Sequence, residues 1–265
     1  MRHHASHRTI PKGQTKMYGV PLLDAIAFAL FALAWLAYHH FVENASRDSG
    51  SLNGLMNDYR VRWMEEMSER EVRILDSAIM SSLQGGTAFF ASSSLIAIGG
   101  AVTLLRATDD VLRIFSDLPF GLVVSRGLWE AKVIGLATIF GYAFFKFSWS
   151  YRLFNYAAIL LGATPEAADP DTALRRQTSY RAARMGIAAA RHFSRGQRAF
   201  FFALAYLGWF ISPYVLIVAT AATLFAMWSR QFNSDARRAI AAEPPEIRFP
   251  RRDAGPRDAS TTDYG

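Results

Sequence analysis

Four long apolar stretches dominate this chain, and the longest runs from Ala199 to Ser229 without a single formal charge. A helix needs about 20 predominantly apolar residues to cross a hydrocarbon core of ~30 Å. Lipid offers backbone groups no hydrogen-bond partner, so each stretch is expected to satisfy its own N–H and C=O groups as a helix. The sequence therefore predicts an all-α, four-span transmembrane bundle with spans at about 20–42, 81–105, 133–151 and 199–229. An all-helical soluble protein is the alternative, although buried soluble helices rarely run uncharged this far.

The segments around the spans are expected to differ in order. Residues 1–18 form a polar tail, residues 19–235 the membrane domain, and residues 243–265, rich in Pro, Arg and Asp, a disordered tail. Amphipathic helices are predicted outside the hydrocarbon in the 43–80 and 169–198 loops, the second beginning near Asp169-Pro170-Asp171. Because the first loop is net acidic and the second strongly basic, we expect the two to dock on each other.

The second of these helices carries an arginine stripe opposite a face of small residues. At 100° per residue the stripe consists of Arg181, Arg184, Arg191, Arg195 and Arg198. The small face permits close helix packing, and the arginine face suits phosphates or acidic partners. Three readings remain open: a solvated face, an interfacial helix at anionic lipid headgroups, and a dedicated site for an anionic ligand.

Charged residues inside spans are costly and are functional hypotheses by default. Lys146 lies toward the far end of the third span, and Asp76, just before the second span, is its predicted partner in an ion pair. The alternatives for Lys146 are snorkelling to the interface and a role in a proton or ion path. Asp24 is expected to cap its helix or to meet Arg106 or Arg230 at the surface.

Two further features concern helix packing. The second span is rich in Gly and Ser, which let helix backbones approach closely, so it is predicted to be the central helix. Pro213 lies near the middle of the fourth span and predicts a helix kink there.

Composition removes several function classes. The chain has no cysteine, which excludes disulfides and thiolate metal sites, and no motif marks catalytic residues or another metal site. No cofactor is expected, and His39, His40 and His192 are not interpreted as haem ligands. The absence of a catalytic pattern favours a non-enzymatic protein without excluding an enzyme. A net charge of +7 is attributed to contact with anionic membrane lipids, and nucleic acid is not expected as a partner.

Several separated strings resemble one bacterial membrane family. They are RILDS, FFASSSLIAIGGAVTLL, FFKFSWSYRLFNYAAILLGATP, ARHFSRGQRAFFFALAYLGWFISPYVLI and RQFNSDA, in this order over about residues 75–235. Together they resemble the family called domain of unknown function 599, which implies a four-span membrane protein and brings no activity. The positions matching its motifs are Asp76, Phe89, Phe90, Lys146, Trp149, Arg152, Asn155, Tyr156, His192, Arg195, Arg198 and Pro213.

Location and role follow as hypotheses. Four spans place both termini on one side, and Lys and Arg near span ends slightly favour the cytoplasm for that side of a bacterial inner membrane. We expect a non-enzymatic scaffold or accessory subunit that binds anionic lipid, a protein partner or a second copy of itself. A small transporter or channel with a polar path around Lys146 is the alternative.

Overall fold

The computed structural model describes residues 22–45, 51–117 and 125–241, and nearly all of them are helical. The two predicted tails lie outside the described residues. The helices are α1 Leu22–Ala45, α2 Leu52–Ser68, α3 Ile74–Arg106, α4 Thr108–Asp117, α5 Arg126–Gly162, α6 Thr172–Ile211, α7 Pro213–Phe232 and α8 Asp235–Ala241. The all-α prediction is confirmed, and the two loops predicted to carry amphipathic helices are helical, as α2 and the first half of α6.

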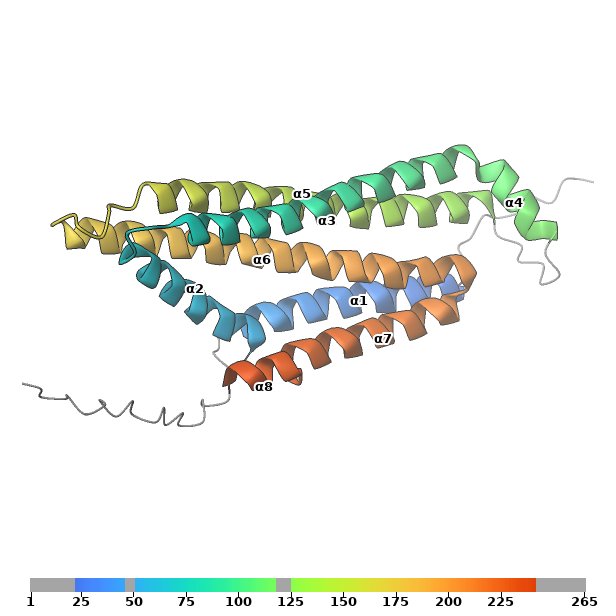
Figure 1. Cartoon of the computed structure of the whole chain (residues 1–265). Coiled ribbons are helices and arrows are strands. Elements are labelled where there is room, and N and C mark those ends of the chain that lie inside the picture. Colours follow the sequence, from blue (N-terminus) through green and yellow to red (C-terminus); the bar gives the residue numbers. More distant parts are fainter. Residues whose placement is uncertain (1–21, 46–50, 118–124, 242–265) are drawn as a thin grey trace, which may run out of the picture.

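Five of the helices, α1, α3, α5, α6 and α7, run along one common axis as an elongated bundle (Figure 1). At one end, which we call the turn end, α6 passes into α7 and α1 begins. At the other end, which we call the α2 end, lie α2, the last turns of α5 and the first turns of α6. The described chain therefore begins at the turn end and finishes, with α8, at the α2 end (Figure 1).

The predicted continuous helix over 199–229 is wrong. The backbone of Ser212 is extended (φ −164°, ψ 159°), α6 ends before it and α7 begins after it. Pro213 explains the break, because it lacks an N–H and disfavours helical backbone in the residue before it. Ser212 then caps the new helix, with its Oγ accepting from the N–H of Val215 at 3.2 Å. Pro213 therefore opens a helix after a chain reversal and does not kink one. The prediction of both termini on one side depended on that continuous helix.

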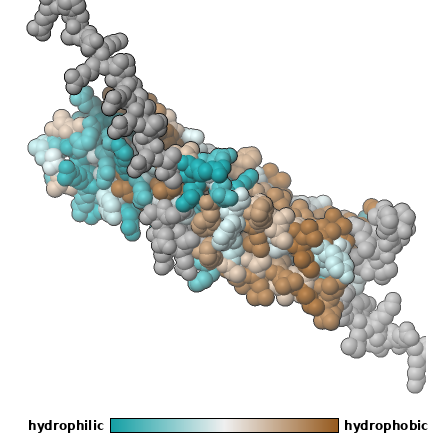
Figure 2. Space-filling view, turned by 90° about the horizontal axis from the view of Figure 1, so that it is seen from below, coloured by the Kyte–Doolittle hydropathy of each residue, from teal (hydrophilic) through white to brown (hydrophobic). Residues whose placement is uncertain are grey.

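Among the described residues, four helices are long and apolar enough to cross a membrane, which matches the predicted number of apolar spans. They are Leu22–Phe41, Ile74–Arg106, Arg126–Gly162 and Pro213–Ile240. This chain is accordingly a multi-pass membrane protein. On the face that Figure 2 shows, the described residues are mostly apolar toward the turn end and mostly polar toward the α2 end. Since α6 has 40 residues and is about 60 Å long, the bundle is roughly twice as long as a ~30 Å hydrocarbon core is thick.

The central helix is α6, and not the span rich in Gly and Ser. Its long buried face packs on α5 and, in its two halves, on α2 and α7, and it includes the predicted small residues Ala182, Ala183, Gly186 and Ala189. At Gly196 the helix meets the ring of Phe147 so closely that an added Cβ would lie 2.7 Å from a ring carbon. The small face is therefore used as predicted.

By contrast, α3 lies at the edge of the bundle. It packs mainly on α5, with weaker contact to α4, along a narrow seam that includes Met80, Thr87, Ser94 and Ala101 at intervals of seven residues. A Cβ added at Gly85, Gly86, Gly99 or Gly100 would meet no atom within 4 Å. The prediction that these small residues make the second span central is wrong, because they face away from the rest of the chain.

We expect Gly135→Ala to destabilise the bundle by about 1–3 kcal/mol, since overpacking a filled core costs this much. A Cβ at this position would lie 2.2 Å from the hydroxyl oxygen of Tyr206, whose side chain is buried. Combining the change with Tyr206→Phe should recover part of the loss. The control is Gly141→Ala, where nothing lies within 4 Å. Equal thermal unfolding midpoints for the two alanine variants in detergent would contradict this packing.

Candidate functional site

A buried ion pair lies inside the bundle near the turn end. The Nζ of Lys132 (α5) is 3.1 Å from Oδ1 of Asp24 (α1), and the side chains are 5% and 10% exposed. Trp209 (α6) donates from its indole Nε1 to the same carboxylate oxygen at 2.7 Å. Three helices that are distant in sequence are thus joined by one carboxylate.

The same ammonium also binds the end of α6. Lys132 Nζ donates to the main-chain oxygen of Trp209 at 2.9 Å and lies 5.0 Å from the centre of its indole ring. In a continuous helix this carbonyl would accept from residue 213, but Pro213 has no N–H. The positive charge also meets the negative end of the α6 dipole. Lys132 therefore satisfies a carbonyl that the turn leaves without a backbone donor, and Asp24 neutralises the buried ammonium.

Asp24 was expected at the surface, either as a helix cap or beside Arg106 or Arg230, and the structure places it in this buried pair instead. Lys132 was assigned to the loop before the third span. Helix α5 starts earlier, at Arg126, so Lys132 lies within it and faces inward. The signal that was available is a lone Lys next to the apolar run starting at Val133.

The predicted ion pair between Lys146 and Asp76 is not formed. Asp76 is fully buried, binds Arg70 at 2.6 Å and accepts from the indole of Trp63 at 2.7 Å. The Nζ of Lys146 lies 5.0 Å from the centre of the ring of Tyr142.

The register between the two helices explains this failure. Gln84 on α3 donates to Asn155 on α5 at 2.8 Å, and Phe90 stacks on Phe147. In this antiparallel pair Asp76 is level with the end of α5, so it lies roughly 25 Å along the axis from Lys146.

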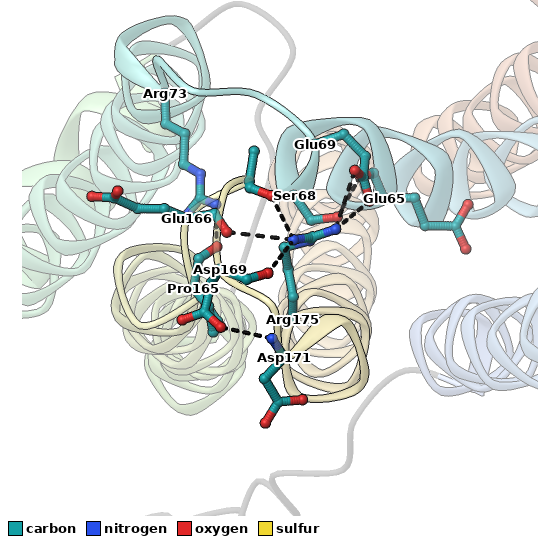
Figure 3. Close-up of polar contacts among 10 residues, drawn as sticks. Glu65, Ser68, Glu69, Arg73, Pro165, Glu166, Asp169, Asp171 and Arg175 are labelled. Atoms are coloured by element: carbon teal, nitrogen blue, oxygen red, sulfur yellow. Dashed lines mark hydrogen bonds and ion pairs between the residues drawn. The ribbon is translucent and has the colours of Figure 1, made fainter.

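At the α2 end, a buried arginine connects α2 to the start of α6 (Figure 3). Arg175, near the start of α6, forms an ion pair with Glu69 after α2 at 3.3 Å and donates to the main-chain oxygens of Ala167 and Asp169 at 2.8 and 3.2 Å. Arg73 similarly donates to the carbonyls of Thr164 and Pro165. The predicted docking of the acidic segment on the basic one is confirmed, with Met64 and Met67 of α2 packed in the same core as the alanines of α6.

The start of α6 follows the sequence prediction closely. Asp171 is the N-cap, and its side chain accepts from the N–H of Leu174 at 2.9 Å. A shallow cleft of about 490 Å³ opens beside this junction, between α2 and α6. Its lining consists of Glu65, Glu66, Ser68, Glu69, Arg176, Ser179 and Tyr180. Among the described residues, no group of His, Asp and Glu is arranged to hold a metal ion.

The arginine stripe of α6 divides into exposed and buried members. Arg181, Arg184 and Arg191 are exposed, Arg195 is half-buried and Arg198 is buried inside the bundle. Arg198 therefore does not belong to the proposed binding face. The prediction treated all five arginines as one exposed face of the helix, but α7 and α1 cover the second half of α6.

Beside the stripe, α5 contributes an arginine held between two aromatic rings. The guanidinium of Arg152 lies 5.8 Å from the ring centre of Trp149 and 5.5 Å from that of Tyr156, and its Nε donates to the Tyr156 hydroxyl at 2.6 Å. The ring of His192 on α6 lies 6.4 Å from that of Trp149. We call the set Arg152, Arg181, Arg184 and Arg191 the basic face.

Comparison with known proteins gives a family and no activity. The model of a family described as protein of unknown function, DUF599, matches residues 26–236. The chain belongs to this family. No curated protein and no solved structure matches it. The match confirms the resemblance seen in the sequence, and it spans Lys132, Trp209 and the basic face.

We expect Lys132→Met to lower the free energy of unfolding by about 3–5 kcal/mol, because it leaves the carboxylate of Asp24 buried without its counter-charge. Replacing both residues, as Asp24→Leu with Lys132→Met, should cost less than the sum of the single changes. Chemical unfolding in detergent measures each variant.

The control for this prediction is Glu130→Gln, a change two residues from Lys132. It breaks the exposed ion pair of Glu130 with Arg126. An exposed pair of this kind contributes about 0–1 kcal/mol. A loss for Lys132→Met no larger than that for Glu130→Gln would show that the buried pair does not hold α1, α5 and α6 together.

Proposed function

We propose that this protein is a non-enzymatic scaffold of the bacterial inner membrane whose basic face binds the headgroups of anionic lipids. The observation that carries the proposal is that four exposed arginines lack an acidic partner in the part of the chain that the structure describes. Arg152, Arg181, Arg184 and Arg191 have no acidic partner among the described residues, whereas Arg70, Arg126, Arg175 and Arg238 each pair with a carboxylate. Exposed guanidinium groups without an acidic partner suit phosphate oxygens, which they bind in a bidentate manner.

The depth of these arginines supports a lipid ligand. Arg152 follows Lys132 by 20 residues along α5, and Arg191 precedes Ile211 by 20 residues along α6. Each interval corresponds to about 30 Å of helix, the thickness of the hydrocarbon core. If the core begins at the turn end, both arginines reach the headgroup level on the far side. Trp149 and Tyr156, both partly exposed, lie at the same level, as aromatic residues of membrane interfaces do.

The same depth argument makes the second half of α6 a fifth membrane pass. It runs between the apolar helices, and its inward residues Phe202, Ala203 and Tyr206 are buried. A helix covered in this way by its neighbours needs less apolar surface than one that faces lipid. With five passes, the first and last described residues, Leu22 and Ala241, lie on opposite sides of the membrane.

The distribution of positive charge then favours one orientation. Of the 20 Lys and Arg in the described residues, 14 lie toward the α2 end, four lie at the turn end, and Lys146 and Arg198 lie between them. Those at the turn end are Arg106, Arg113, Arg126 and Lys132. Because positively charged segments remain in the cytoplasm, we place the α2 end and the C-terminal end there and the N-terminal end outside. This proposal replaces the earlier one of two cytoplasmic termini.

The middle of the bundle favours a scaffold over a conduit. Between α3, α5 and α6 the rings of Phe90, Phe147, Phe193 and Phe200 contact one another. Packed rings at this depth occupy the space that a polar path near Lys146 would need. A transporter therefore stays the second hypothesis, without a contact that favours it.

We expect the triple change Arg152→Gln, Arg184→Gln and Arg191→Gln to lower binding of phosphatidylglycerol by about tenfold or more, because each lost charge near an anionic surface removes about 1 kcal/mol. Native mass spectrometry of the protein released from nanodiscs that contain phosphatidylglycerol and phosphatidylcholine measures the number of bound lipids. Salt should weaken the wild-type binding toward the level of the variant.

The matched control removes three arginines elsewhere in the described chain, as Arg62→Gln, Arg106→Gln and Arg113→Gln. These changes keep the same net charge as the first variant and leave the basic face intact. Equal loss of phosphatidylglycerol from both triple variants would mean that binding follows net charge alone. Unchanged binding in the basic-face variant would overturn the proposal.

A further inference from the structure

The outer face of α3 has no partner in the described chain. Helix α3 packs on α5 along the seam described above, and the residues on its opposite side are exposed along the helix. Large apolar side chains stand on this side, with Phe89 exposed by 66% and Ile96 by 75%.

The exposed side has its own regular spacing. Two rows of residues repeat at intervals of seven and lie three residues apart, on the side roughly opposite the seam. One row consists of Ile79, Gly86, Ser93 and Gly100, and the other of Leu75, Ser82, Phe89, Ile96 and Thr103. A seven-residue repeat of this kind keeps one side of a helix against a parallel neighbour over its whole length.

Lipid alone does not account for this face, because its apolar residues continue beyond the hydrocarbon. Gln84 is level with Asn155, three residues past Arg152, so residues before Gln84 lie outside the hydrocarbon in the proposed placement. There Ile74 and Leu75 are 75% and 63% exposed, at the polar end of the molecule. Apolar residues that continue a membrane face into water indicate a surface that another protein covers.

The shape of this face fits the same face on a second copy of the protein. Phe89 and Ile96 project from a surface on which Gly86, Ser93 and Gly100 leave hollows, so the rings of one copy can enter the hollows of the other. The chain is strongly basic overall, yet residues 77–105 carry no charge, so two copies approach here without repulsion. A two-fold axis along the membrane normal makes equivalent residues meet and keeps both α2 ends on the same side.

The available area is sufficient for a pair. From Leu75 to Thr103 the face is about 42 Å long and, for a helix of about 10–12 Å diameter, offers about 400–500 Å² per copy. The pair then buries about 800–1,000 Å², near the lower limit for a specific interface. Confinement to the membrane plane and parallel orientation reduce the entropy that association costs.

We propose that this protein is a parallel homodimer whose two copies meet through the outer faces of α3. The proposal depends on the fold and the membrane placement, and not on the binding of lipid by the basic face. Loss of lipid binding would therefore leave it unaffected, and loss of the dimer would leave the basic face intact.

Cysteine cross-linking tests the contact directly, because the natural chain contains no cysteine and one introduced residue is the only thiol. Ser82→Cys and Ser93→Cys place a thiol on the outer face of α3. Phe145→Cys places one on α5 at about the depth of Ser93, where the side chain is 72% exposed. After oxidation in membranes we expect about tenfold more disulfide-linked dimer for the two α3 variants than for Phe145→Cys, because equivalent residues face each other across a two-fold axis.

A second variant blocks the face without touching the fold. Gly86→Leu with Gly100→Leu fills two of the three hollows, and neither position has an atom within 4 Å of an added Cβ. This variant should lose the Ser93→Cys cross-link and run as a monomer by single-molecule photobleaching in dilute bilayers. The control Gly141→Leu changes an equally open glycine on α5 and should keep the dimer.

Three results would overturn the proposal. The first is a wild-type protein that is monomeric at every protein-to-lipid ratio. The second is equal cross-linking at Phe145→Cys and Ser93→Cys. The third is a different protein bound in equal amount on the α3 face, detected by cross-linking from Ser93→Cys in native membranes.

Discussion

One contact holds the arrangement of helices together: the ammonium of Lys132 on the main-chain oxygen of Trp209, with Asp24 as its counter-charge. A chain reversal inside an apolar segment leaves carbonyls without donors, which costs several kcal/mol each in lipid. Lys132 supplies one donor, and Ser212 caps the helix that follows. Because this contact stabilises the turn, α7 can return along the bundle and α6 becomes its central helix.

The central position of α6 accounts for the rest of the architecture. In the proposed placement, its second half is covered by neighbours and passes through the membrane with less apolar surface than they have, while its first half extends beyond the hydrocarbon and carries exposed arginines. Arg175 anchors that half to α2, and Arg152 adds to it from α5. The small residues of α3 are not needed inside the chain, so they remain available for a second copy. Lipid headgroups on one face and a dimer contact on another suit a scaffold in the membrane.

Much of the fold was predictable, because it depends on local properties of the sequence. The apolar runs predicted the helices, and Asp171 marked the start of α6. The opposite net charges of the two loops predicted the docking of α2 on α6. The failures all required three-dimensional information. An uncharged run of 31 residues can form one span or parts of two spans, and its composition does not distinguish the two cases. Only Pro213 marked the turn. Lys146 and Asp76 were paired by approximate depth, and the register of α3 on α5 separates them.

The most direct test is labelling of Tyr214→Cys, the only thiol in the chain, with a maleimide that does not cross membranes. Tyr214 is the second residue of α7 and is 65% exposed at the turn end. The proposed topology predicts rapid labelling of Tyr214→Cys from the periplasmic side. It predicts no labelling of Phe225→Cys, which lies 12 residues after Pro213 on α7, about 18 Å from the turn end and near mid-membrane. A Tyr214→Cys that reacts from neither side would place residue 214 inside the hydrocarbon, as in one continuous span, and would contradict the hairpin.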